Sequence, residues 1–159
     1  MLQKSKQYRD QAMTPAKFIA SMAYKLPSLI FWGIRLKRLE EDTCTVSLPY
    51  NFRSKNPFKS IYFSALNGAG ELSTGLLCQM HSQDFGKISM VVVEFQSKFY
   101  KKAKGTTFFT CNDGVNIRSV LEKLTSGGTD TIKTYSQGTD ENGNKLCEMW
   151  VTWSFKKND

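Results

Sequence analysis

Hydrophobic residues recur along the chain with two periods, and these periods predict the order of its elements. Apolar and polar residues alternate in segments that predict strands over 29–40, 43–50, 87–100, 106–111, 129–137 and 145–155. Apolar residues at helical spacing predict helices over 14–25, about 60–80 and 115–126. This order of helices and hairpin-connected strands predicts an α+β fold with an antiparallel sheet.

Local signals support several of these boundaries. Thr14 and Pro15 suit the N-cap and first position of the first helix, and Pro27 is expected to end it. Asn142 and Gly143 are typical of a hairpin turn between the last two strands. In the strand over 87–100, one face is expected to carry Val91, Val93, Phe95 and Phe99.

The segment Ser60–His81 is small and apolar, and it carries a single carboxylate, Glu71. Its interior contains Gly68, Gly70 and Gly75. Each glycine costs a helix about 1 kcal/mol relative to alanine. Three of them indicate a compensating close approach of another backbone, as in a central helix wrapped by a curved sheet.

Glu71 has three competing interpretations. A carboxylate buried without partners has a raised pKa, which makes Glu71 a candidate catalytic acid or base. It is alternatively solvent-exposed, or bonded to a local hydroxyl such as Ser73 or Thr74. A phosphate loop in "NGAGELSTG" is disfavoured, because two leucines follow the last glycine where lysine and serine or threonine are required.

Length and composition indicate a single domain over 1–159, with residues 1–28 as an N-terminal helical extension. The chain has no run of eighteen apolar residues, so no membrane span is expected. The polar N-terminus lacks the apolar core of a secretory signal, so a cytoplasmic location is expected.

The chemistry available to the chain is limited by its composition. Its widely spaced cysteines form no CxxC pair and are expected to be buried, reduced thiols; they are Cys44, Cys78, Cys111 and Cys147. A single histidine, His81, excludes multi-histidine metal sites, and no metal or cofactor is expected. The net charge of +8 favours acidic partners such as nucleic acid, phosphates or anionic surfaces.

One long helix after the second strand resembles the hotdog fold of acyl-CoA thioesterases. In the phenylacetyl-CoA type, the motif is Asn or Gln, five residues, H-G-G, and an acid nine residues after the histidine. Asn56 matches the amide and Glu71 the acid, whereas Tyr62 stands at the histidine, and Phe63 and Ser64 stand at the glycines.

The resemblance covers about residues 30–156. The segment "KFYKKAKG" (98–105) is similar to the aromatic-x-basic-Pro-Ala segment of the family, with Lys102 at the proline. The resemblance is closest to a poorly characterised hotdog branch that lacks H-G-G and has a helix inserted between later strands, which the segment 115–126 fits.

The resemblance implies hydrolysis of an acyl-CoA or related acyl thioester. The acid, Glu71, acts as nucleophile or as general base toward water, and the N–H of Phe63 polarises the thioester carbonyl. Asn56 orients the water or the thioester. The site then lies at the subunit interface of a homodimer or tetramer, with Asn56 and Phe63 from one subunit and Glu71 from the other.

Two features leave the activity open at this stage. Tyr62 and Phe63 are bulkier than the family's motif residues and would narrow the substrate pocket. The Tyr62 hydroxyl could donate a hydrogen bond in place of the family's histidine. Alternatively, both rings belong to the hydrophobic core. A cluster of lysines beside Phe99 and Tyr100 suits the phosphates of coenzyme A, nucleic acid, or a solvated strand end; it comprises Lys98, Lys101, Lys102 and Lys104.

Four hypotheses follow. The first is a hotdog thioesterase, and the second is a non-catalytic hotdog protein that binds an acyl chain or acyl-CoA. A nucleic-acid-binding protein is a third possibility, which predicts binding that weakens steeply with salt and does not depend on Glu71, and nucleic acid is the less expected partner. A cone-shaped α+β ligand-binding fold is the structural alternative.

Overall fold

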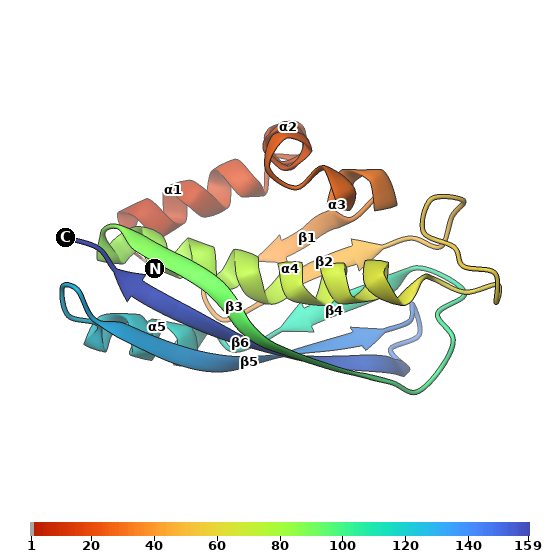
Figure 1. The fold of residues 1–159 in the computed structure, drawn as a ribbon. Helices are drawn as coiled ribbons and strands as arrows, with labels where there is room; N and C mark the ends of the chain where they lie inside the picture. Colours follow the sequence, from red (N-terminus) through yellow and green to blue (C-terminus); the bar gives the residue numbers. More distant parts are fainter. Residues whose placement is uncertain (1) are drawn as a thin grey trace.

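The computed structural model describes residues 2–159 and contains one antiparallel sheet around one long helix (Figure 1). Three helices come first: α1 (Gln3–Ala12), α2 (Pro15–Lys25) and α3 (Pro27–Trp32). The remaining helices are α4 (Phe63–Ser82), the 3-10 turn η1 (Gln83–Phe85) and α5 (Gly114–Lys123). The strands are β1 (Arg35–Leu39), β2 (Cys44–Leu48), β3 (Ile88–Phe99), β4 (Thr107–Cys111), β5 (Thr129–Thr139) and β6 (Lys145–Lys157).

The six strands lie in the order β1-β2-β4-β5-β6-β3, and every neighbouring pair is antiparallel. Figure 1 shows the sheet curving around α4, with α1–α3 on the other side of that helix. The α+β class and the sheet wrapped around a central helix, both expected from the sequence, are confirmed. β1 and β3 are the edge strands, and within residues 2–159 the long strand β3 is bonded on one side only, to β6.

The glycines of α4 allow the close approach that the sequence predicts. A Cβ at Gly70 would lie 2.5 Å from Met149 Cγ, and one at Gly75 would lie 3.1 Å from the Trp153 ring. Both distances are shorter than ordinary carbon–carbon contact. The small residues of α4 are therefore required by β6, which packs directly against them.

The predicted strand over 29–40 is wrong in its first half. Residues Pro27–Trp32 form α3, and only Arg35–Leu39 form a strand. Pro27 does end α2, but it also occupies the first turn of α3, where its missing N–H costs nothing. Gly33 then ends α3 in the left-handed conformation, with φ +83°.

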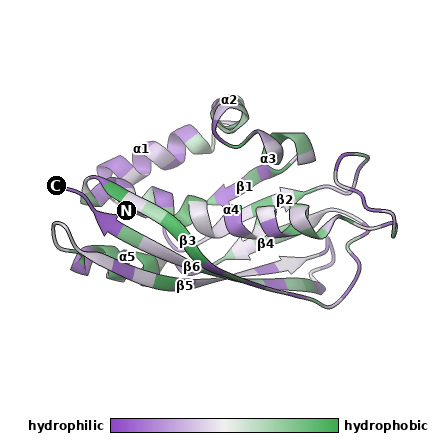
Figure 2. Cartoon of the chain, in the orientation of Figure 1, coloured by the Kyte–Doolittle hydropathy of each residue, from purple (hydrophilic) through white to green (hydrophobic). Residues whose placement is uncertain are grey.

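α1 was not predicted, although residues 1–28 were expected to be helical. Figure 2 shows that its residues are mostly hydrophilic, so it lacks the apolar stripe that marks a helix. It is attached by the packing of Tyr8 and Ala12 against the core and by polar contacts. The Tyr8 hydroxyl donates to Gln79 Oε1 at 2.8 Å, and the Ser5 N–H donates to Asp84 Oδ1 at 3.0 Å.

The predicted face of β3 is also wrong in part. An irregularity between Val92 and Glu94 shifts the register with β6. Phe95 and Phe99 pair with Val151 and Cys147 on the helix-facing side, whereas Val91 pairs with Ser154 on the other side. A bulge of this kind inserts one residue and reverses the alternation.

The other predicted elements are present with small changes at their ends. The helix over 60–80 is α4, the helix over 115–126 is α5, and Gly143 has φ +81° in the turn between β5 and β6. All four cysteines are buried. Within residues 2–159, no helix combines the length and apolar character that crossing a membrane requires.

Candidate functional site

The loop between β2 and α4 is organised by the amide of Asn56. Its Oδ1 accepts hydrogen bonds from the N–H groups of Phe58 (2.9 Å) and Ser60 (3.2 Å). Its Nδ2 donates to Ser60 Oγ (3.1 Å) and to the Ile61 carbonyl (3.2 Å). The amide therefore fixes the shape of the loop that leads into α4, and both of its N–H groups are engaged there.

The first turn of α4 has free hydrogen-bond donors. The N-cap residue, Tyr62, makes no side-chain capping bond. The N–H groups of Ala65 and Leu66 bond to the Tyr62 carbonyl, but those of Phe63 and Ser64 have no acceptor among residues 2–159. The start of a helix also carries a partial positive charge, so this turn suits an oxyanion.

A pocket of about 540 Å³ lies at this end of α4. One wall is the loop over 56–63 and the other is the chain over 99–103, which follows β3. Ala103 joins the walls, since its carbonyl accepts from Ile61 N–H at 2.8 Å. Aromatic rings cover much of the surface, and they belong to Phe58, Tyr62, Phe63, Phe99 and Tyr100. The size and apolar lining suit a small organic ligand.

The predicted lysines gather around the mouth of this pocket. Lys101 and Lys102 line it, and Lys102 and Lys104 line a neighbouring hollow of about 240 Å³ beside the β5–β6 turn. The ammonium of Lys98 lies 5.9 Å from the centre of the Tyr100 ring. None of the four forms a salt bridge within the described part of the chain.

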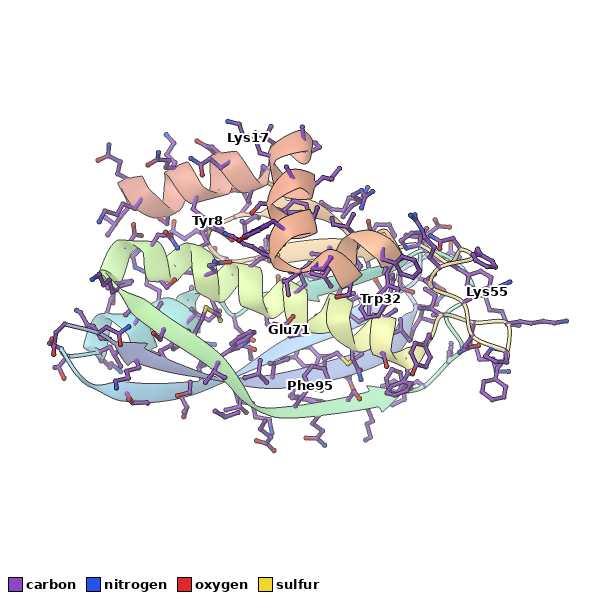
Figure 3. The ribbon with its side chains drawn as sticks, turned by 45° about the horizontal axis from the view of Figure 1, so that its top comes forward. Tyr8, Lys17, Trp32, Lys55, Glu71 and Phe95 are labelled. Carbon is purple, nitrogen blue, oxygen red and sulfur yellow. The ribbon has the colours of Figure 1, made fainter. Side chains whose placement is uncertain are left out.

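Glu71 lies in the middle of α4, half-buried (Figure 3). Burial raises the pKa of its carboxyl to about 7. No hydrogen bond or ion pair to the carboxyl exists within residues 2–159, so nothing opposes the effect of burial. At neutral pH the Glu71 carboxyl is therefore partly protonated and partly ionised.

The local hydroxyls do not bond the Glu71 carboxyl. Ser73 Oγ bonds to the Gly70 carbonyl and to Ser136 Oγ, at 2.8 and 2.7 Å. Thr74 Oγ1 donates to the backbone carbonyl of Glu71 at 2.8 Å and accepts from Trp153 Nε1 at 3.0 Å. The interpretation of Glu71 as capped by Ser73 or Thr74 is therefore wrong.

One chain brings together only part of the predicted site. Asn56, Tyr62 and Phe63 line the pocket, whereas Ser64 and Glu71 do not. Glu71 is eight residues beyond Phe63 on a straight helix, which separates the two by roughly 12 Å along its axis. The Glu71 carboxyl therefore cannot act at the N–H of Phe63 in the same chain.

Two residues near these groups were not predicted from the sequence. Asn67 lies one turn before Glu71 on the same side of α4, and its Oδ1 is buried without a partner within residues 2–159. The i, i+4 spacing from Glu71 was the available signal. Phe58 was missed as a pocket residue, because its place depends on the hydrogen bonds of Asn56.

The pocket wall is anchored from behind by Glu148 on β6. Tyr100 donates a short hydrogen bond to its carboxylate, and Tyr135 and Lys145 donate to Oε1, both at 2.6 Å. These three donors lower the pKa of Glu148 to about 2, and Lys145 has the largest effect, followed by Tyr100 and Tyr135. Glu148 thus attaches the lysine-bearing segment over 99–104 to the sheet.

This anchor predicts a loss of stability in acid. The folded-state pKa of Glu148 is lower than its ordinary value of 4.5, so its contribution is present above that pH and is lost as the pH falls toward 2. We expect Glu148→Gln to lower the melting temperature at pH 7 and to reduce its fall between pH 5 and about 3. Glu141→Gln, on the neighbouring exposed turn, is the control. Equal melting curves for both variants across this range would contradict the anchor.

Comparisons with known proteins bear on the fold. No protein-family model matches the sequence, and no curated protein matches it either. Among solved structures, PA5026 from Pseudomonas aeruginosa, described as a probable thioesterase of unknown function, is 22% identical, with a TM-score of 0.72 over 89% of this chain and 95% of that chain. Thioesterase HI1161 from Haemophilus influenzae is 12% identical, with a TM-score of 0.68 over 91% of each chain.

The chain has the hotdog fold. The expectation drawn from the resemblance is thereby confirmed for the architecture. A third hotdog structure, SAV0944 from Staphylococcus aureus, is 16% identical, with a TM-score of 0.62 over 80% of this chain and 97% of that chain. At these identities the similarity establishes the fold, and the chemistry has to be argued from the site.

Proposed function

We propose that the protein is a thioesterase that hydrolyses an acyl-CoA or related acyl thioester. The observation that carries the proposal is the unpartnered carboxyl of Glu71, with its pKa of about 7. A general base is most effective when its pKa lies near the working pH. Glu71 lies on α4, the helix whose first turn offers free N–H groups to the pocket.

The reaction follows from these two features. The Glu71 carboxylate removes a proton from water, and the water oxygen attacks the thioester carbonyl carbon. The N–H group of Phe63, which lines the pocket, stabilises the oxyanion that forms. The carbon–sulfur bond then breaks, and the proton held by Glu71 passes to the leaving thiolate. The products are a carboxylic acid and a free thiol.

The distance between Glu71 and Phe63 within one chain requires a second copy. β3 supports this arrangement, because it is a twelve-residue edge strand with one side unbonded. Exposed apolar side chains line it at Val91, Val93, Phe95 and Phe99. In the proposed homodimer, or a tetramer of such dimers, Glu71 of one subunit acts at the pocket of the other, where Asn56 holds the loop.

Two comparisons support the proposal. HI1161 is named a thioesterase. SAV0944, also named a thioesterase, has been solved as two variants in which a glutamine and a glutamate, fifteen positions apart in that chain, are each replaced by alanine. Asn56 and Glu71 are also fifteen positions apart.

The lysines at the pocket mouth suit the phosphates of coenzyme A. Lys101 and Lys102 line the pocket itself, and Lys98 and Lys104 flank it. Free ammonium groups are available to a polyanion there. A coenzyme A thioester also agrees with a cytoplasmic location, which forms part of the proposal.

A second candidate is a non-catalytic protein that binds an acyl chain or acyl-CoA. The rings of Tyr62 and Phe63 favour it, since they stand edge-to-face, 5.0 Å apart, directly at the free N–H groups. The Asn56 amide favours it too, because its N–H groups are already bonded within the loop.

A panel of short, long and aromatic acyl-CoAs separates the two candidates. We expect the wild-type protein to release thiol from at least one member, measured with a thiol reagent. Acyl-CoA that raises the melting temperature without any thiol release would establish the binding protein instead. If no member of the panel gave either thiol release or a thermal shift, both candidates would be contradicted.

A further inference from the structure

The loop before α4 exposes two phenylalanines at one end of the molecule. Phe52 is 82% exposed and Phe58 is 71% exposed. The loop is well bonded: Arg53 N–H donates to Asn51 Oδ1 at 2.8 Å, and Ser54 Oγ donates to the Pro49 carbonyl at 2.6 Å. A defined backbone therefore holds both rings in the solvent, and keeping this apolar surface in water is unfavourable in free energy.

Cations surround these rings. Arg53, Lys55 and Lys59 lie in the same loop and are exposed, and Figure 3 shows Lys55 extending away from the body of the molecule. Lys101 and Lys102 come from the other pocket wall, and Lys102 Nζ lies 3.5 Å from the Phe58 carbonyl. We name these seven residues the tip surface: Phe52, Arg53, Lys55, Phe58, Lys59, Lys101 and Lys102.

The tip surface has few acidic neighbours. The sequence has no Asp or Glu from Thr43 to Gly70, or from Phe95 to Asn112. Among the described residues, the nearby acids are Asp140 and Glu141 on the β5–β6 turn and Glu148, whose carboxylate is bonded to Tyr100, Tyr135 and Lys145. The Asp140 carboxylate already accepts from the backbone and side chain of Asn144. Within residues 2–159, no tip cation forms a salt bridge.

Exposed phenylalanines among unpaired cations match the chemistry of an anionic lipid surface. Lys and Arg are attracted to anionic headgroups, while aromatic rings enter the boundary between headgroups and acyl chains. Single-stranded nucleic acid would need open ring faces for stacking. The Lys55 ammonium instead lies over the Phe52 ring, 4.7 Å from its centre.

We infer that the tip surface binds the protein peripherally to anionic membranes, with Phe52 and Phe58 in the headgroup region. The pocket opens between the same two segments that carry the tip surface, so docking places the pocket mouth against the lipid. An amphiphilic ligand then reaches the pocket from the interface. Membrane binding itself does not rest on the proposed hydrolysis.

Vesicle co-sedimentation tests this inference. We expect the wild-type protein to bind phosphatidylcholine vesicles that contain phosphatidylserine, and not phosphatidylcholine alone, at about 0.1 M salt. Combined Phe52→Ser and Phe58→Ser should weaken binding about tenfold or more. Combined Arg53→Gln, Lys55→Gln and Lys59→Gln should weaken it about a hundredfold.

Matched controls come from α1 and α2, outside the tip surface. Tyr24→Ser removes an aromatic residue that is 90% exposed on α2, and a triple change to glutamine removes three exposed cations, at Lys4, Lys6 and Lys17. Both should retain wild-type binding within about twofold.

Four outcomes would overturn the inference. The first is equal binding to neutral and anionic vesicles. The second is anionic binding that survives both tip variants, which would assign the contact to another surface. The third is loss of self-association, measured by sedimentation velocity, in the phenylalanine variant; the tip would then be a contact between copies of this chain. Binding of a poly-uridine oligonucleotide in place of vesicles would likewise reassign the surface.

Discussion

Glu71→Gln should lower kcat for thiol release by about a thousandfold, within the range that a general base contributes. Glutamine preserves the shape of the side chain but cannot remove a proton from water. The measurement is the rate of thiol release from the best acyl-CoA of the panel. Glu122→Gln, an exposed position on α5, is the control and should retain wild-type kcat.

The pH dependence gives an independent check on the same residue. Since Glu71 has a pKa of about 7 and acts as the base, kcat/KM should rise with pH and level off above that value. Residual activity of Glu71→Gln should lack this rise. Wild-type rates in the variant would exclude Glu71 from the chemistry.

Folding of the variant can be verified from the sign of the linkage. The pKa of Glu71 is raised in the folded state, so its contribution to stability is present below about pH 4.5 and is lost as the pH rises through 7. Glutamine does not ionise, so the Glu71→Gln variant does not lose this stability as the pH rises. Its melting temperature above pH 7 should therefore equal or exceed that of the wild type.

Combined Val91→Lys and Val93→Lys on β3 should convert a dimer into monomers and abolish most thiol release. Both side chains are more than half exposed in one chain, at 59% and 57%, so the monomer should still fold. In a paired edge, the lysines would add positive charge to both strands of the contact, which opposes strand pairing. Activity should fall at least a hundredfold, because each site needs groups from two chains.

Sedimentation velocity at micromolar concentration measures the assembly. Val115→Lys, at a valine on α5 that is 67% exposed, is the matched control and should remain dimeric. A wild-type protein that is monomeric and active would contradict the two-chain site, while leaving the role of Glu71 to be judged from its own variant.

Most of the fold was predictable because most segments are strongly periodic, as in β6, where Cys147, Met149 and Val151 alternate with more polar residues. The apolar run over 29–34 has no clear period, and such runs do not distinguish a helix from a strand. The bulge at Val92–Glu94 was also hidden, because it depends on register with β6 and leaves no mark in the composition.

The candidate site was predictable only as separate residues. Asn56 was identified through the resemblance to the thioesterase motif, and Glu71 as a lone carboxylate among apolar neighbours, which also indicated its raised pKa. The bonding of the Asn56 amide within its own loop depends on backbone geometry that no spacing reveals. Glu148 was missed for a similar reason, because its partners come from three different segments.

The buried cysteines can serve as reporters of local unfolding in this chain. Cys44 lies on β2, Cys78 on α4, Cys111 on β4 and Cys147 on β6, each at most 1% exposed. Burial raises the pKa of Cys111 and Cys147 to about 12, so their thiols react with alkylating reagents only after exposure to water. Alkylation followed by peptide mapping would therefore give the opening free energy of four separate elements in the unlabelled wild-type protein.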